Sequence, residues 1–142
     1  MPSDLPEGVP RIVAPGLRST ARMNEASPPW HFDRAAALDR LDHDPDLLAN
    51  MIRQFLEEAP VTLAAIDAAV NAGDGAAIGD AAHALKTAAG YLAADALCLR
   101  AQTIEGFGRV GQIDDARAAW PALAASAAGV IAVLERVAED EK

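Results

Sequence analysis

The sequence has few aromatic residues and little positive charge, and each scarcity excludes a class of protein. Aromatic side chains make up 4% of the 142 residues. Strands are rich in aromatic and β-branched residues, and no segment here alternates apolar and polar residues cleanly, so we expect no β-sheet. The chain has 12 basic and 21 acidic residues, which gives a formal net charge of -9. Because nucleic-acid binding needs clustered Lys and Arg, we expect no nucleic-acid ligand.

Cysteine is nearly absent, and two kinds of membrane signal are weak or missing. The single cysteine, Cys98, excludes an intramolecular disulfide and a multi-cysteine metal cluster. The N-terminus has no basic segment followed by an apolar run, so it does not predict a secretory signal. Residues 118–134 carry no charge, but they are mostly alanine and too weakly apolar for a convincing membrane span. We therefore expect a cytoplasmic protein in which this segment is a buried helix of a bundle.

Proline and glycine divide the chain into two parts. Six of the nine prolines lie in residues 1–29, at positions 2, 6, 10, 15, 28 and 29. This composition predicts a flexible leader. The remainder, residues 30–142, is rich in helix-forming residues and long enough for one domain with a hydrophobic core. We therefore predict a single folded domain after the leader.

Apolar residues in this domain recur at the spacing of amphipathic helices. Asp33 is expected to cap a short helix, whereas Asp44 and Pro45 predict the start of a long helix that ends at "NAGDG". Three further apolar stripes follow, in residues 78–92, 97–104 and 123–137. Since no helix can bury its stripe alone, we predict an all-α fold, an antiparallel four-helix bundle with a short extra N-terminal helix. Pro121 is expected to kink or restart the last helix.

The segment "DAAHALKTAAGYL", residues 80–92, carries one histidine and one lysine among alanines. With an advance of about 100° per residue, its apolar side chains fill an arc of roughly 120°, and His83 lies almost opposite the centre of that arc. We therefore predict that the imidazole faces solvent. Except for Lys86, the helix neighbours of His83 are small or short, whereas an ordinary solvent face carries long charged side chains.

The small residues around His83 predict a docking surface for another protein. Glycine inside a helix costs about 1 kcal/mol relative to alanine, so glycines on this face favour close approach by a partner. If the preceding helix turns back at residues 73–75, its alanines lie level with the imidazole and extend a flat, weakly apolar patch. The alternative is that alanine is simply the best helix former. The predicted docking residues are Ala64, Ala65, Ala68, Ala76, Gly79, Asp80, Thr87 and Gly90.

Three segments resemble the histidine-containing phosphotransfer (HPt) domains of multistep two-component relays: "AHALKTAAGYLAADAL", "FDRAAALDRLDHDPDLLANMIRQFLEEAP" and "IEGFGRVGQIDDA". The likeness covers most of residues 30–137 and is strongest at the His-x-Leu-Lys core. It implies a four-helix bundle in which His83 accepts a phosphoryl group from a receiver-domain aspartate and passes it to another, with Lys86 near the phosphate. Thr87 and Ala93 depart from the family, which commonly has glycine there. The bulk of Thr87 beside the imidazole is expected to affect partner choice or transfer rate.

The chemistry that this resemblance implies needs little from the chain itself. An exposed imidazole is largely neutral at cytosolic pH, so one ring nitrogen can attack without a dedicated base. The sequence has neither a Gly-x-x-x-x-Gly-Lys phosphate loop nor an obvious carboxylate cluster for Mg²⁺. We therefore expect a monomeric phosphocarrier without kinase activity, cofactor or metal, whose partner, a receiver domain of a hybrid histidine kinase or response regulator, supplies Mg²⁺. Lys86, the only lysine before Lys142, can offset phosphate charge.

Two other readings of the sequence compete with a phosphocarrier. Asp80-x-x-His83 has the spacing of helical di-iron motifs, but such sites need a second copy and further inward carboxylates. His31 and His43 are expected at or near the surface as structural residues. A non-catalytic helical adaptor or dimerisation module is the second alternative, and under it the loss of His83 would leave partner binding intact. Its support is the small-residue surface of the last helix at Ala124, Ala125, Ala128 and Ala132.

Overall fold

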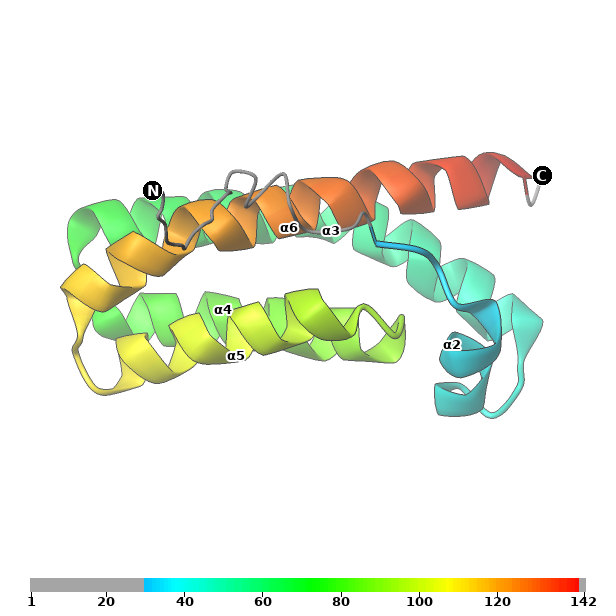
Figure 1. Ribbon diagram of the computed structural model, residues 1–142, viewed down its shortest axis with the longest axis horizontal. Coiled ribbons are helices and arrows are strands. Elements are labelled where there is room, and N and C mark those ends of the chain that lie inside the picture. The colour runs from blue at the N-terminus through cyan, green and yellow to red at the C-terminus, as the bar shows by residue number, and fades with distance from the viewer. Residues whose placement is uncertain (1–29, 141–142) are drawn as a thin grey trace, which may run out of the picture.

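The computed structural model describes residues 30–140, and the fold within this range is all-α. The described elements are α2 (Arg34–Arg40), α3 (Pro45–Ala72), α4 (Gly75–Tyr91), α5 (Asp95–Arg109) and α6 (Ile113–Asp140), drawn in Figure 1. The prediction of an all-α bundle with a short extra helix before four long ones is confirmed. The predicted flexible leader, residues 1–29, lies outside the described residues.

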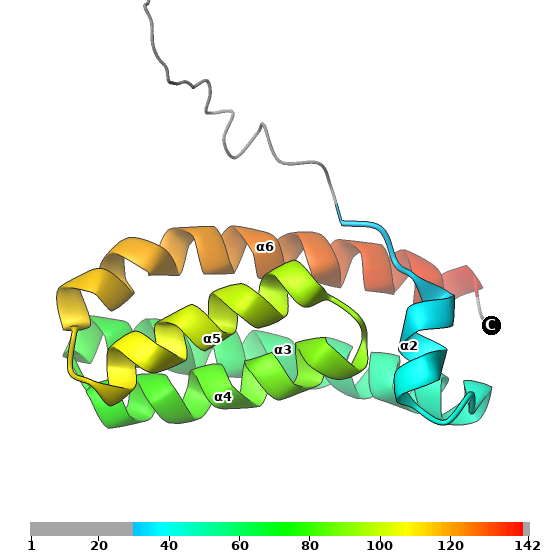
Figure 2. The same cartoon turned by 60° about the horizontal axis from the view of Figure 1, so that its bottom comes forward.

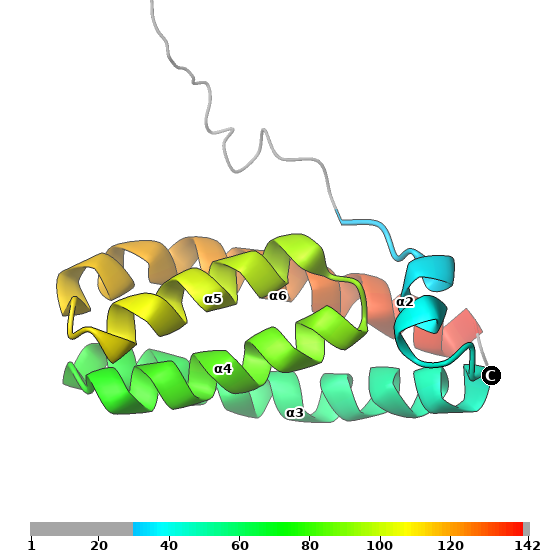
Figure 3. The same ribbon diagram turned by 90° about the horizontal axis from the view of Figure 1, so that it is seen from below.

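The four long helices are joined by short turns and form a bundle in which each helix packs against two others. Helix α4 packs against α3 and α5, and α6 packs against α5 and α3. Figures 2 and 3 show α4 and α5 side by side along one face of the bundle, with the short α2 lying across the end of α3. The face formed by α4 and α5 is the one that carries His83.

The helix ends follow from residues that the sequence already marks. The Asp33, Asp44 and Asp74 side chains cap α2, α3 and α4 by accepting hydrogen bonds from backbone N–H groups of the first turn. Gly73 ends α3 in the left-handed conformation, at φ 71°. Ala93, in the turn after α4, also has a positive φ of 59°. Glycine would adopt that conformation at lower cost than alanine.

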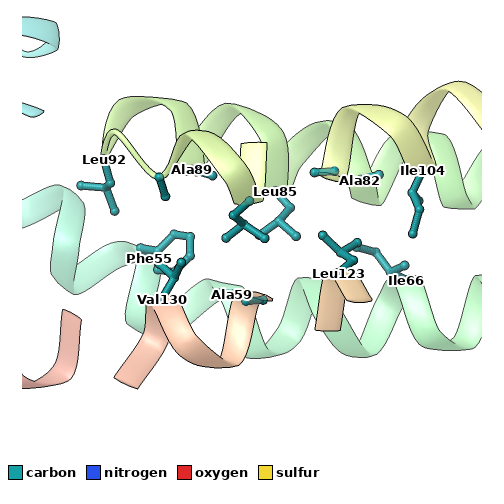
Figure 4. Packing of buried hydrophobic residues seen from close by; sticks show 14 of the residues in the cluster. Phe55, Ala59, Ile66, Ala82, Leu85, Ala89, Leu92, Ile104, Leu123 and Val130 are labelled. Carbon is teal, nitrogen blue, oxygen red and sulfur yellow. The ribbon is translucent and has the colours of Figure 1, made fainter. Parts of the chain in front are cut away.

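The core lies between two helix pairs. In Figure 4, side chains of α4 and α5 such as Leu85 and Ile104 point toward Phe55 of α3 and toward Leu123 and Val130 of α6. All five of these side chains are at least 97% buried. The apolar stripes predicted from the sequence are therefore the ones that meet in the core.

The Leu123→Ala substitution is expected to lower the free energy of unfolding by about 2–5 kcal/mol, because a fully buried leucine leaves a cavity that its neighbours fill only in part. Leu99→Ala is the matched control, since Leu99 is 63% exposed and the same change should cost less than about 0.5 kcal/mol. Urea denaturation of both variants measures the difference. Equal losses would contradict the assignment of Leu123 to the core.

Helix α6 differs from its prediction at Pro121. The helix runs without interruption from Ile113 to Asp140, so the predicted restart is wrong, whereas the alternative, a kink at Pro121, stays a prediction. Pro60 likewise lies inside α3. A proline within a helix removes one backbone hydrogen bond, but both rings are exposed and both helices bury apolar residues on either side of the proline. Packing of the flanking turns thus outweighs the loss of one hydrogen bond.

Helix α6 is also long and apolar enough, by length and composition, to cross a membrane. Such a helix is weak evidence for a span, because core helices of bundles pass the same test. Here one face of α6 contributes to the core, and the opposite face is exposed and rich in alanine. The buried residues of α6 are Ala116, Leu123, Ala127, Val130 and Leu134.

Candidate functional site

His83 lies in the middle of α4, on the side of the helix that faces away from the core. Ala82 and Leu85, which flank it along the helix, are at least 98% buried, whereas the His83 side chain is 55% exposed. This orientation follows from the 3.6-residue period, because the apolar stripe of α4 fixes which positions face outward. The imidazole is thus accessible from solvent. The opposite face of the same helix is buried in the core and holds the backbone of His83 in place.

Glu105 of α5 reaches the imidazole from the neighbouring helix. Its Oε2 lies 3.0 Å from His83 Nδ1, and its Oε1 lies 2.7 Å from Lys86 Nζ. The Glu105 side chain is only 14% exposed. One half-enclosed carboxylate therefore joins the histidine and the lysine, although the three residues come from two helices.

Arg109, one turn further along α5, completes the cluster. Its NH2 lies 3.6 Å from Glu105 Oε2, and its NH1 donates a hydrogen bond to Asp80 Oδ1 at 2.9 Å. The guanidinium lies over Gly79, where a Cβ atom would come within 2.9 Å of three guanidinium-group atoms. The side chains of His83, Lys86, Glu105, Arg109 and Asp80 are called the histidine cluster below.

The electrostatics of the cluster keep Glu105 ionised. The hydrogen bond from Lys86 is the largest cause that lowers the pKa of Glu105 below its ordinary value, desolvation opposes it, and the hydrogen bond with His83 lowers the pKa further. An ionised carboxylate can only accept hydrogen bonds. His83 Nδ1 must therefore carry the proton in this contact, and in the neutral ring the lone pair available for reaction is on Nε2.

The lowered pKa of Glu105 predicts how the cluster contributes to stability as pH changes. Because the folded-state pKa is below the ordinary value, the stabilisation is complete at pH values above that ordinary value and is lost as pH falls through the folded-state pKa. Glu105→Gln should thus lower the free energy of unfolding by about 1 kcal/mol at neutral pH, and the deficit should shrink below about pH 4. Urea denaturation of both proteins between pH 3 and 7, as a rough range, measures it. A deficit that stays constant over this range would contradict the ion-pair assignment.

The predicted docking residues differ in their exposure and in their partners. The alanines at 64, 65, 68 and 76 and Thr87 are exposed. Gly90 is half-buried, and its carbonyl accepts a hydrogen bond from Arg40 at 2.8 Å. Asp80 is exposed but pairs with Arg109.

The prediction for Gly79 needs correction. Gly79 is buried, because the Arg109 guanidinium covers it, so it presents no open surface to a partner. The missing side chain makes room for a residue of the same chain. The glycine does mark a close approach, as the sequence indicated, but by an internal neighbour.

A groove between α3 and α4 was not predicted from the sequence. Its cavity volume is about 220 Å³, and Met51, Phe55, Thr87, Ala88 and Tyr91 are among the residues that line it. Thr87, which lies one helical turn after His83, forms part of its wall.

The other two histidines do not join this site, and Asp80 and His83 gain no further metal ligands there. His31 and His43 are exposed near the start of the described chain, and His43 Nε2 lies 3.4 Å from Asp39. Within residues 30–140, no three His, Cys, Asp or Glu side chains are grouped so that they could hold a metal ion. Glu105 and Arg109 are the cluster residues that sequence reasoning missed. Their spacing of four residues on one helix was the available signal.

Comparison with known proteins agrees with this architecture. The crystal structure of histidine-containing phosphotransfer protein B (HptB) from Pseudomonas aeruginosa PAO1 superposes with a TM-score of 0.70 at 21% sequence identity, over 78% of this chain and 96% of that one. At this identity the likeness shows the fold alone. No curated protein matches the chain significantly. The family model for the Hpt domain matches residues 50–139, which is more than half of the chain. The chain therefore belongs to the Hpt domain family, whose members carry out histidine phosphotransfer in two-component relays.

Proposed function

We propose that His83 is the phosphoacceptor of this chain, and that it takes a phosphoryl group from an aspartate of one receiver domain and passes it to an aspartate of another. The observation that carries the proposal is the state of the imidazole. Its Nδ1 is held by the Glu105 carboxylate at 3.0 Å, and its side chain is 55% exposed. Nε2 is thereby left as the nucleophilic atom of an accessible ring.

In the forward step, the Nε2 lone pair attacks the phosphorus of the aspartyl phosphate. The N–P bond forms while the P–O bond to the aspartyl group breaks, and the electron pair of that bond leaves with the aspartate carboxylate. The Nδ1 proton stays on the ring, so the imidazole becomes positively charged as the bond forms. The ionised Glu105 beside Nδ1 stabilises this charge, because it lies within hydrogen-bond distance and is largely shielded from water.

Lys86 has a different part in the proposed reaction. Its ammonium lies one helical turn from His83, and in the resting state it pairs with Glu105 Oε1 at 2.7 Å. An ammonium at this position can offset part of the charge on the phosphate oxygens. Mg²⁺ and the remaining catalytic groups come from the receiver, since phosphoryl transfer depends mainly on in-line positioning and charge neutralisation. In this proposal the chain is a monomeric carrier that acts in the cytoplasm, and it has no kinase activity of its own.

The surface beside His83 is suited to a receiver. Val61 is 71% exposed and lies at helical spacing from the three exposed alanines of α3, at 64, 65 and 68. With the groove lined by Thr87 and Tyr91, these residues give α3 and the outer side of α4 a low, weakly apolar surface. Such a surface allows a folded partner to bring a short aspartyl phosphate up to Nε2.

The direct test is to incubate the purified chain with a panel of radiolabelled phosphorylated receivers and then with unlabelled ones. The proposal predicts that the chain takes up phosphate that is acid-labile and base-stable, and that a second receiver removes it. Binding of receivers without any uptake of phosphate would instead favour the non-catalytic adaptor.

A further inference from the structure

We infer that Arg109 is a positioning residue for His83, which acts through Glu105, and that Gly79 is glycine because the Arg109 guanidinium occupies the space of its side chain. The inference rests on the proposed function of His83 and adds to it a residue from another helix. Arg109 itself does not contact the imidazole in the described contacts; its ion-pair partners are Glu105 and Asp80.

The two oxygens of Glu105 have different partners. Oε1 accepts from Lys86, whereas Oε2 faces both His83 Nδ1, at 3.0 Å, and Arg109 NH2, at 3.6 Å. If Lys86 were the only cationic partner of Glu105, only Oε1 of the carboxylate would have a positively charged neighbour. Arg109 forms an ion pair with the second oxygen, the one that selects the ring tautomer. Its positive charge also makes Oε2 less basic, which keeps the shared proton on Nδ1.

The guanidinium is held in turn by two features of α4. Asp80 Oδ1 accepts its NH1 hydrogen bond at 2.9 Å. Gly79 provides the flat backbone beneath it, because a Cβ there would lie 2.9 Å from Arg109 Cζ, Nε and NH1. These atoms are at the far end of a flexible side chain. Alanine at position 79 would therefore displace the guanidinium while the helix backbone stays in place.

The Gly79→Ala variant tests this arrangement, with Gly129→Ala as its matched control. Gly129 also lies inside a helix, but a Cβ there meets nothing within 4 Å. Both changes give the same gain in helix propensity, so only the displacement of Arg109 distinguishes them. Arg109→Gln is the second variant, which removes the charge without the steric change.

Two measurements are made on each variant. The first is the set of ¹⁵N chemical shifts of the His83 ring in the unphosphorylated protein, which report the tautomer. The second is the rate of phosphorylation by phosphoramidate, a small donor with no docking surface. Gly79→Ala and Arg109→Gln should both shift the tautomer away from Nδ1–H and slow phosphorylation roughly threefold to tenfold. Gly129→Ala should match the wild type in both measurements.

The inference is overturned if the tautomer and the rate in both Gly79→Ala and Arg109→Gln equal those of the wild type. A slower rate with an unchanged tautomer also overturns it, because Arg109 would then act on the phosphate directly. The tautomer measurement needs no phosphate. A wild-type chain that is never phosphorylated therefore contradicts the proposed function, while the effect of Arg109 on the ring can still be decided.

Discussion

The His83→Ala variant is expected to fold like the wild type and to take up no phosphate from any phosphorylated receiver. The side chain is more than half exposed and makes no contribution to the core, but its removal deletes the hydrogen bond with Glu105, so the free energy of unfolding should fall by about 1 kcal/mol. Loss of uptake should be complete, because no other described histidine lies in the cluster. Phosphorimaging of the chain after incubation with labelled receivers, together with thermal unfolding, measures both effects.

His43→Ala is the matched control for this experiment. His43 is also exposed and also lies near a carboxylate, with its Nε2 3.4 Å from Asp39 Oδ1. That contact is within α2 and the turn after it, outside the histidine cluster. This variant should accept phosphate at the wild-type rate. Persistent labelling of His83→Ala would show that another residue is the acceptor.

The second large effect is expected at Glu105. Glu105→Ala should slow the phosphorylation of His83 roughly tenfold to a hundredfold, because a hydrogen bond with a charged partner contributes about 1.5–3 kcal/mol and this one stabilises the ring as it becomes positive. The neutral Glu105→Gln variant can still accept from Nδ1, so its rate should lie between those of Glu105→Ala and the wild type. Single-turnover transfer from a saturating phosphorylated receiver measures the rate of the chemical step.

Glu135→Ala is the control for Glu105→Ala. Glu135 is an exposed glutamate on α6, and the change removes the same charge from the chain outside the histidine cluster. It should leave the transfer rate unchanged at moderate ionic strength. If Glu105→Ala and Glu135→Ala transfer equally fast, Glu105 has no part in the reaction beyond its contribution to net charge.

The sequence predicted the fold well where local signals and core packing agree. The Asp44–Pro45 start and the glycine stop of α3 are local signals that each act within a few residues. The apolar stripes of α3, α4, α5 and α6 then fix which faces meet. The predicted restart at Pro121 is wrong, because the effect of an internal proline depends on how firmly the flanking turns are packed, and sequence periodicity does not measure this.

The site was predictable only in its α4 half. The positions of His83 and Lys86 relative to the core follow from helical period, which acts along one element. Glu105 and Arg109 come from α5, and their distance from His83 depends on how α4 and α5 are aligned. That alignment is set by packing between helices, where Gly79 lies under Arg109. A glycine inside a helix indicated a close approach but did not identify the neighbour.

The most direct test of the account is the identity of the phosphorylated atom. Correlation of ³¹P with ¹⁵N in the phosphorylated, ¹⁵N-labelled chain identifies the nitrogen that is bonded to phosphorus. We predict a single N–P bond at Nε2 of His83, with the proton retained on Nδ1 beside Glu105. Phosphorus on Nδ1 of His83, or on any other residue, would contradict it.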